Sequence, residues 1–396
     1  MHSGSDDDLV LHTLLSVTQD VIRERGETSH RKKKQAAHEL LVRGYFSPDS
    51  LYDLSKFEEC FYISRNLFLR ITSDLERNYE FFQLRLDARG KRGFTTIQKC
   101  TAALRQLRYG ITADASDEYL EMSERTGRDG TYLFYEYVIE LYRDIYLRHP
   151  TKSDVEQLYV AHEAKHGFPG MLGSIDCIHW EWANCPNAWC GQFTRRYHGV
   201  PTVILEAVVS NDLWFWHAFF DIAGSNNDLN GKAPYMSYVV NGNEYKYGYY
   251  LGDEIYPECH CHIIEYPTRT LDKAKLTTML TACVILHNMI IQEKGRTICS
   301  YTGNDVLNPP VVIQVGSPTY FSRVLEIQNH ETHHNLRHDL TEHIWGRQLQ
   351  GGNDDGDEED EGDDYNENAE GNDEADEDDD DDVIFDLLGF MCILII

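Results

Sequence analysis

No stretch of the 396-residue chain holds the roughly 20 consecutive apolar residues that a membrane-spanning helix needs. Two apolar runs, at residues 276–291 and 383–396, fall short of that length and include polar side chains. Residues 1–10 are acidic and lack the apolar segment of a signal peptide. The ten cysteines are scattered without the close spacing of a disulfide-rich domain, which favours a reducing compartment. We therefore expect neither a membrane partner nor a small secreted scaffold.

Basic residues are missing from one part of the chain. Residues 353–382 hold 20 acidic residues and no Lys or Arg, whereas the rest of the chain holds 46 acids and 36 bases. The formal net charge of −30 therefore belongs mainly to this segment. Because this segment has too little apolar surface to offset the loss of chain entropy on folding, we expect a disordered acidic tail at 353–382. An apolar tail at 383–396 follows it. Two interpretations of the acidic tail stay open: a solvated spacer, and a polyanion that competes with DNA or attracts basic chromatin proteins.

The N-terminal part is polar and then helical. Residues 1–44, with a basic cluster at 31–34, are expected to form a disordered basic arm, either a nuclear import signal or a solvated turn. Residues 45–150 have helical periodicity and are expected to form a helical domain, with DNA binding as a candidate role. Within it, a helix at 95–109, Gly110 and a second helix at 113–122 have the outline of a helix-turn-helix. The second helix is acidic and would be repelled by phosphates, which favours a packed helical pair instead.

From residue 170 the pattern predicts an α/β fold. Strands are expected at 171–182, 202–209, 213–222 and 247–256, with a hairpin connection at 210–212 and a buried helix at 276–291. This core, at 168–292, is followed by a helical extension at 293–350 that contains an exposed His-rich helix. Four tryptophans alternate at period two, and we expect them in the core, with base stacking as the alternative; they are Trp180, Trp182, Trp214 and Trp216.

Two acidic residues stand in otherwise apolar strands. Asp176 lies in GSIDCIHW, and Asp253 follows YYLG. A buried carboxylate must be paired, hydrogen-bonded or metal-bound, because an isolated buried charge is very costly. Carboxylates on adjacent strands can share Mg²⁺, and two such ions can activate water for phosphodiester cleavage. A structural carboxylate at a strand end remains the alternative.

Longer motifs are more specific than this spacing. They read FPGMLGSIDCIHWEWANCPNAW from residue 168, PTVILEAVVSNDLWFWHAFFDIAGSNNDLN from 201, YYLGDEIYPE from 249 and LTTMLTACVILHNMI from 276. From about residue 45 to 346 the chain resembles the plant PIF/Harbinger transposases and their domesticated, nuclease-like derivatives. The resemblance implies an RNase H-like core of mixed sheet and flanking helices, a DDE triad that binds Mg²⁺ or Mn²⁺, and DNA as substrate. It also implies a nuclear location and a Myb-like protein partner.

The resemblance extends to single residues. Asp176 and Asp253 match the first two catalytic acids of the family, and Asp228, in the SNND motif, matches another acidic position of the metal site. Which of Asp228 and Asp253 is the inner ligand stays open. Candidate phosphate contacts, for which a solvated loop is the alternative, are Arg195, Arg196, His198 and Lys232.

The chain departs from the family after Glu258. The family continues for several tens of residues to a helix that bears the third acid in a motif like ERAFG, whereas here Cys259 follows at once and no such motif exists. The catalytic glutamate and its helix are therefore predicted to be deleted, and we expect weak or no nuclease activity. The alternative is a non-enzymatic protein, either domesticated for chromatin or partner binding or a decayed transposon product.

Three smaller expectations concern the residues around this deletion. The nearby acids Glu254, Glu258 and Glu265 are not expected to replace the missing glutamate. The cluster at 259–262 alternates Cys and His, but consecutive residues cannot easily all face one tetrahedral zinc, even with Cys185 and Cys190 added. Loss of a helix should also leave apolar surface exposed near Ile255 and Ile263.

Overall fold

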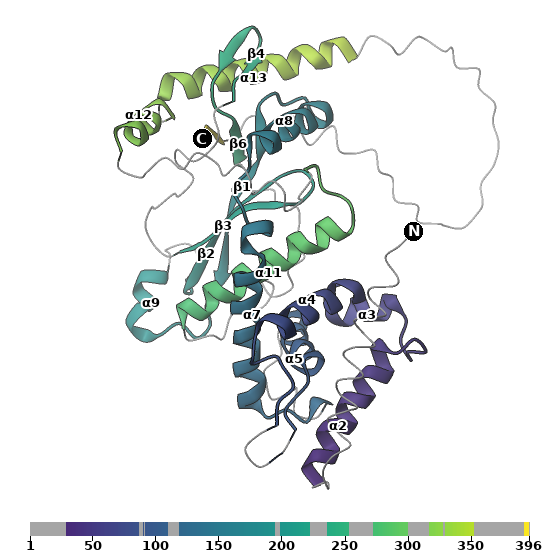
Figure 1. Ribbon diagram of the computed structural model, residues 1–396. Helices are drawn as coiled ribbons and strands as arrows, with labels where there is room; N and C mark the ends of the chain where they lie inside the picture. Colours follow the sequence, from purple (N-terminus) through teal and green to yellow (C-terminus); the bar gives the residue numbers. More distant parts are fainter. Residues whose placement is uncertain are drawn as a thin grey trace, which may run out of the picture.

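The computed structural model describes residues 29–86, 90, 92–109, 119–194, 199–221, 236–252, 272–299, 317–327, 329–351 and 392–395. Figure 1 shows three parts: an N-terminal helical unit, a central sheet with helices packed against it, and a long helix beyond the sheet. The expected α/β class with a mixed sheet is confirmed.

The helical unit is built around aromatic side chains. Its elements are α2 (Ser29–Leu41), the π-helical turn η1 (Val42–Phe46), α3 (Leu54–Phe61), α4 (Arg65–Asn78), α5 (Thr96–Tyr109) and α7 (Glu124–Tyr146). The rings of Phe46, Phe57, Phe61 and Phe68 are buried and touch one another, several of them edge to face. Helix α2 lies within the first 44 residues, where a disordered arm is expected, so that expectation is wrong for residues 29–41.

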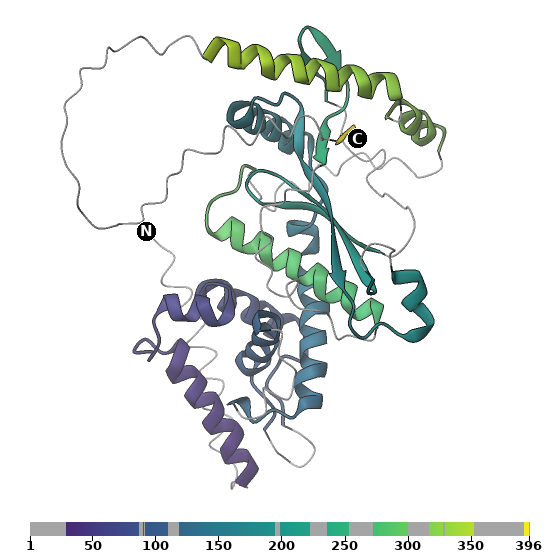
Figure 2. The same ribbon diagram turned by 180° about the vertical axis from the view of Figure 1, so that it is seen from behind.

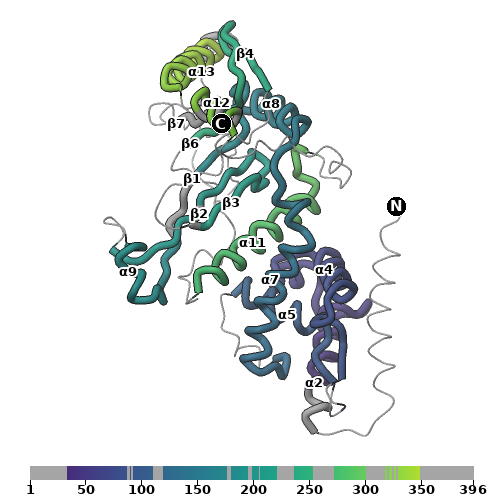
Figure 3. Tube along the Cα trace, turned by 60° about the vertical axis from the view of Figure 1, so that its left-hand side comes forward, coloured from purple at the N-terminus to yellow at the C-terminus, as the bar shows by residue number. Residues whose placement is uncertain are grey.

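The predicted helical pair is described only in part. Helix α5 confirms the helix expected at 95–109, but residues 110–118, which include most of the second helix, lie outside the described residues. The helix-turn-helix therefore stays a prediction. Helix α7 is 23 residues long and connects the helical unit to the sheet, where it lies beside α11 (Lys273–Glu293), as Figure 3 shows.

The central sheet has five strands in the order β3-β2-β1-β6-β7. They are β1 (Met171–Glu181), β2 (Thr202–Val209), β3 (Phe215–Asp221), β6 (Tyr249–Gly252) and β7 (Cys392–Ile395). Strands β1, β2 and β3 are antiparallel neighbours, β6 joins β1 in parallel, and β7 pairs with β6 antiparallel. The connection expected at 210–212 is confirmed: Asp212 accepts hydrogen bonds from Ser210 Oγ (2.5 Å) and from the backbone N–H of Ile298 (2.7 Å).

Helix α11 covers one face of the sheet, as Figure 2 shows. Its Leu276, Leu280 and Val284 are buried with Trp180 and Phe215 of the strands. All four tryptophans are at most 4% exposed, so the expected core packing is confirmed. Among the described residues, α11 is the helix long and apolar enough to cross a membrane, but half of its apolar window is buried against the rest of the chain. A core helix has the same length and composition, so the finding is weak evidence for a membrane segment.

The remaining elements lie around the sheet. They are α8 (Lys152–His166), α9 (Asn187–Phe193), a hairpin of β4 (Tyr238–Val240) and β5 (Asn243–Tyr245), α12 (Pro318–Ile327) and α13 (His330–Gly351). Helix α13 buries Leu336, Leu340 and Ile344 and leaves His334 and His338 exposed, so the expected His-rich helix is confirmed. The apolar C-terminal run contributes β7, which was not expected.

Candidate metal centre on strands β1 and β6

Asp176 lies in the middle of β1, as the sequence predicts. The antiparallel ladder between β1 and β2 runs from Ser174, opposite Val209, to Glu181, opposite Thr202, and Asp176 is opposite Ala207. The strand is central, because β2 and β6 pair with its two edges. The backbone at Asp176 is therefore fixed by the sheet.

Strand β6 pairs with β1 and ends one residue before the second predicted acid. It pairs with β1 in parallel register, and the last pair joins Gly252 to Ile175. Each of these two residues immediately precedes a predicted catalytic acid in the chain, Asp176 after Ile175 and Asp253 after Gly252. Neighbouring strands lie about 4.8 Å apart. Asp253 itself lies outside the described residues.

Glycines allow these strands to approach their neighbours closely. A Cβ on Gly173 would lie 2.4 Å from the carbonyl oxygen of Val209, and a Cβ on Gly248 would lie 2.6 Å from the Tyr159 hydroxyl. The register of the β1–β6 pair shifts between Met171 and Gly173. Side chains at these two glycines would push β1 and β6 away from their neighbours and so disturb the register that aligns Ile175 with Gly252.

A buried asparagine in the LHNM motif fixes α11 against the sheet. Asn288 is fully buried; its Oδ1 accepts from the N–H of Phe215 (2.9 Å), and its Nδ2 donates to the carbonyls of Phe215 (2.8 Å) and Tyr146 (2.6 Å). The neighbouring His287 ring contacts the Leu213 carbonyl at 2.9 Å. One side chain thus joins α11, β3 and α7, which gives the motif a structural role.

A buried histidine fixes the beginning of β1. Each ring nitrogen of His162 has one contact. Nδ1 lies 3.0 Å from the carbonyl oxygen of Met171, and Nε2 accepts a hydrogen bond from the N–H of Asn211 (3.2 Å). The neutral ring satisfies both contacts, since one nitrogen donates and the other accepts. Burial lowers the pKa of His162 and so favours this neutral form.

Sequence reasoning missed one carboxylate in the sheet. Glu206 of β2 is opposite Cys177, the residue after Asp176, and its buried Oε1 has no hydrogen-bond partner among the described residues. Burial raises its pKa. The signal was available, because Glu206 stands in the apolar run VILEAVV just as Asp176 stands in its own. Glu206 and Asp176 occupy ladder positions that differ by one residue, so they are not cross-strand partners.

Most other predicted site residues lie outside the described part of the chain. They are Asp228, Asp253, Arg195, Arg196, His198 and Lys232, together with Glu254, Glu258, Glu265, Ile255, Ile263 and the Cys/His cluster at 259–262. Cys185 and Cys190 are described and are free thiols. Within the described ranges, no group of three His, Cys, Asp or Glu side chains is arranged to hold a metal ion.

Comparison with known families supports a transposon origin. The model of the plant transposon protein family matches residues 144–263 and 258–298. The chain is thus similar to plant transposon proteins from the end of α7 through the sheet to α11. This similarity covers less than half of the chain and supports a transposon-derived, transposase-related protein.

A second family model, a domain of unknown function, matches residues 38–76 in the helical unit. No curated protein and no solved structure matches the chain. The similarity to plant transposon proteins is therefore the comparison that bears on the candidate centre.

Proposed function

We propose that this transposon-related chain is a DDE-type, metal-dependent nuclease-like protein of the PIF/Harbinger group whose catalytic centre is impaired. Strands β1, β2, β3 and β6 with α11 would form its RNase H-like core. Asp176 and Asp253 would be the remaining catalytic carboxylates, with Asp228 as a further ligand of Mg²⁺ or Mn²⁺. The substrate would be DNA, contacted by Arg195, Arg196 and Lys232, and the location would be the nucleus.

The parallel register of β1 and β6 carries this proposal. Because Ile175 and Gly252 are paired, the two acids follow two residues that are neighbours in the sheet. Carboxylate oxygens are the ligands that Mg²⁺ prefers, and acids on adjacent strands can share one ion. The metal would activate water and stabilise the leaving oxygen, while the chain's own role is to hold the two carboxylates at a fixed spacing.

The proposed loss of activity is compatible with the form of the family match. The plant transposon family model matches in two pieces that overlap at residues 258–263. The segment that bears the third acid is predicted to be missing after Glu258. A family match divided at this point is what a deletion there would produce.

The test is cleavage of terminal-inverted-repeat DNA in Mg²⁺ and in Mn²⁺, with Asp176→Asn as the inactive reference. We expect the wild-type chain to cleave no faster than this variant, while still binding Mn²⁺ in a titration. Cleavage that Asp176→Asn abolishes would show an active nuclease. If the wild-type chain binds no Mn²⁺, the proposed metal centre is wrong. Sequencing the transcript between the codons for Glu258 and Cys259 tests whether the deletion is a feature of the protein.

A non-enzymatic role is the second candidate, and the missing ERAFG-like motif favours it. In that role the fold would be retained for chromatin or partner binding, a Myb-like protein included, or the chain would be a decayed transposon product. Co-precipitation from nuclear extract, followed by identification of partners, separates these outcomes from the nuclease when the cleavage assay is negative.

A further inference from the structure

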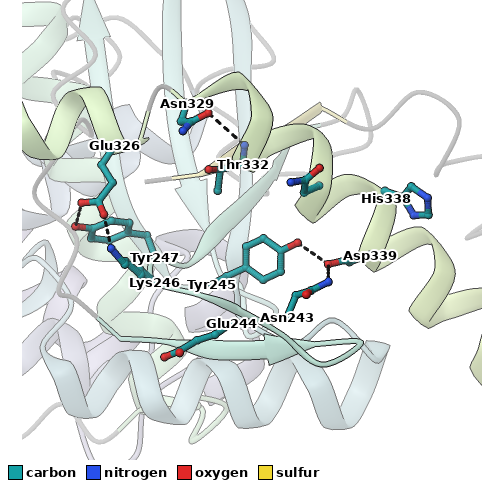
Figure 4. A pocket seen from close by; sticks show the side chains of 11 residues that line it. Asn243, Glu244, Tyr245, Lys246, Tyr247, Glu326, Asn329, Thr332, His338 and Asp339 are labelled. Carbon is teal, nitrogen blue, oxygen red and sulfur yellow. Dashed lines mark hydrogen bonds and ion pairs between the residues drawn. The ribbon is translucent and has the colours of Figure 1, made fainter.

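A polar groove lies between the β4–β5 hairpin and helices α12 and α13 (Figure 4), and Asp176 of the candidate metal centre does not line it. It has a volume of about 590 Å³. On one side it is lined by consecutive residues from Asn243 to Tyr247, and on the other by Glu326, Asn329, Thr332, Asn335, His338 and Asp339. No described residue of β4 contributes to its lining. The groove therefore lies along the outer edge of β5.

The hairpin register shows which backbone groups this edge offers. Val240 and Asn243 flank a two-residue turn of Asn241 and Gly242, both with positive φ (49° and 85°). In such a type I′ hairpin the flanking pair is hydrogen-bonded and the next pair is not. The next pair joins Val239 to Glu244, so the N–H and C=O of Glu244 point away from β4.

Side-chain contacts hold the two walls of the groove together. Asp339 of α13 accepts from Asn243 Nδ2 (2.8 Å) and from the Tyr245 hydroxyl (2.6 Å). At the other end, Glu326 of α12 accepts from Lys246 Nζ (2.6 Å) and from the Tyr247 hydroxyl (3.2 Å). A groove fixed at both ends is preorganised, so a ligand would lose little affinity in ordering it.

The helical wall and the charge of the lining indicate the kind of ligand. Asn329, Thr332, Asn335 and His338 follow one another at steps of three residues and give the wall amide, hydroxyl and imidazole groups. The lining holds three acids, Glu244, Glu326 and Asp339, against one base, Lys246. An extended segment that carries Lys or Arg complements this net negative charge.

We propose that this groove binds an extended, basic segment of a partner protein, which adds as a strand to the outer edge of β5. The helical wall would contact alternate side chains of the segment, and the backbone groups of Glu244 would pair with its main chain. The chain already uses strand addition nearby, because β7 adds to the edge of β6 from a distant part of the sequence. The proposal is independent of nuclease activity.

The test measures fluorescence anisotropy of a labelled five-residue peptide, Lys-Val-Lys-Val-Lys, with Glu-Val-Glu-Val-Glu as the matched acidic probe. We expect saturable binding of the basic probe and at least about tenfold weaker binding of the acidic one. Glu244→Pro removes the outward N–H without touching the ladder to β4, since Pro is tolerated at edge positions whose N–H faces outward. It should weaken binding by about tenfold beyond Glu244→Gln, which removes only the charge.

Val239→Pro is the matched control, because Val239 is the cross-strand partner of Glu244 and its N–H points from the opposite edge. We expect it to bind the basic probe like the wild type. A second readout uses the wild-type chain alone: hydrogen exchange at the Glu244 amide should slow when the basic probe binds. No saturable binding, equal binding of both probes, equal losses in the two proline variants, or an unprotected Glu244 amide would each overturn the proposal.

Discussion

Gly252 of β6 is paired in parallel register with Ile175 of β1. The next residues in the chain are Asp176 and Asp253. If they bind one metal ion together, the effects of their substitutions on metal affinity cannot be independent. We expect Asp176→Asn and Asp253→Asn each to weaken Mn²⁺ binding by at least about tenfold, and the double variant to add little. Isothermal titration of the three variants measures this. Asp144→Asn, at an exposed position on α7, is the control; fully additive losses would contradict a shared ion.

Asn288→Leu should destabilise the fold strongly. The change leaves the N–H and C=O of Phe215 and the carbonyl of Tyr146 without their buried partner, and each such group costs about 1–3 kcal/mol. We expect the free energy of unfolding, from urea titration, to fall by at least about 3 kcal/mol. Thr278→Ala on the same helix removes only a local bond to Ala274 and should change little. A small effect of Asn288→Leu would show that α11 is not held by this side chain.

The ion pair of Arg148 with Asp154 is a second test of stability. The Asp154 side chain is 3% exposed, and Arg148 holds it with contacts of 2.5 and 3.0 Å. Although burial acts to raise the pKa of Asp154, the hydrogen bonds from Arg148 and Thr151 outweigh it and lower the pKa. The ion pair therefore contributes fully to the stability of the fold at pH values above the ordinary carboxyl pKa. This contribution is lost as the pH falls through the lowered pKa of Asp154.

Arg148→Met would leave that carboxylate buried without its cationic partner, so we expect the free energy of unfolding from urea titration at pH 7 to fall by about 3–5 kcal/mol. The exposed pair of Arg128 and Glu124 is the comparison, and Arg128→Met should cost less than about 1 kcal/mol. Equal losses would mean that burial does not decide the strength of these pairs.

Because of His38, we expect the stability of the fold to decrease in mild acid. Burial, with a smaller contribution from Arg92, lowers the pKa of His38 to about 4. In the unfolded chain its pKa is about 6.5, so the unfolded state binds more protons between these values and stability falls as the pH falls from 6.5 to 4. We expect the wild type to lose about 2 kcal/mol more than His38→Gln between pH 7 and pH 5. The exposed variant His334→Gln should follow the wild type, and parallel curves for all three would contradict the role of His38.

Deletion of residues 392–396 should promote association of the chain. It removes β7 and leaves the edge of β6 without the partner that β7 provides, and open edges pair with other chains. We expect faster growth of light scattering on mild heating than for the full-length chain. Identical scattering and identical melting temperatures would show that β7 does not protect this edge.

Elements with a strong local pattern were predictable from sequence. The strand expected at 202–209 is β2 without change, and the helix expected at 276–291 is α11 with a few more residues at each end. Both follow from the side-chain periodicity of a buried strand or helix. Helix α2 was missed because its basic run was interpreted as disordered, although Lys, Gln, Ala, Glu and Leu are strong helix formers.

Two other elements were missed for different reasons. The β4–β5 hairpin had a local signal, Asn241-Gly242 between short β-rich runs, which was not used. Strand β7 had none, because four residues cannot indicate which distant edge they will join. Of the candidate centre, the strand position of Asp176 was predictable, whereas the glycine contacts and the register of Ile175 with Gly252 depend on packing between distant segments.

The position of β7 in the sequence has a consequence for synthesis. Cys392 pairs with Gly252, about 140 residues earlier in the chain. At roughly 5–20 residues per second, β6 leaves the ribosome on the order of ten seconds before its partner strand exists. During that interval the edge of β6 that faces away from β1 must stay unpaired or pair with something else. The time of greatest exposure for this edge is therefore during translation, before the completed chain can close its own sheet.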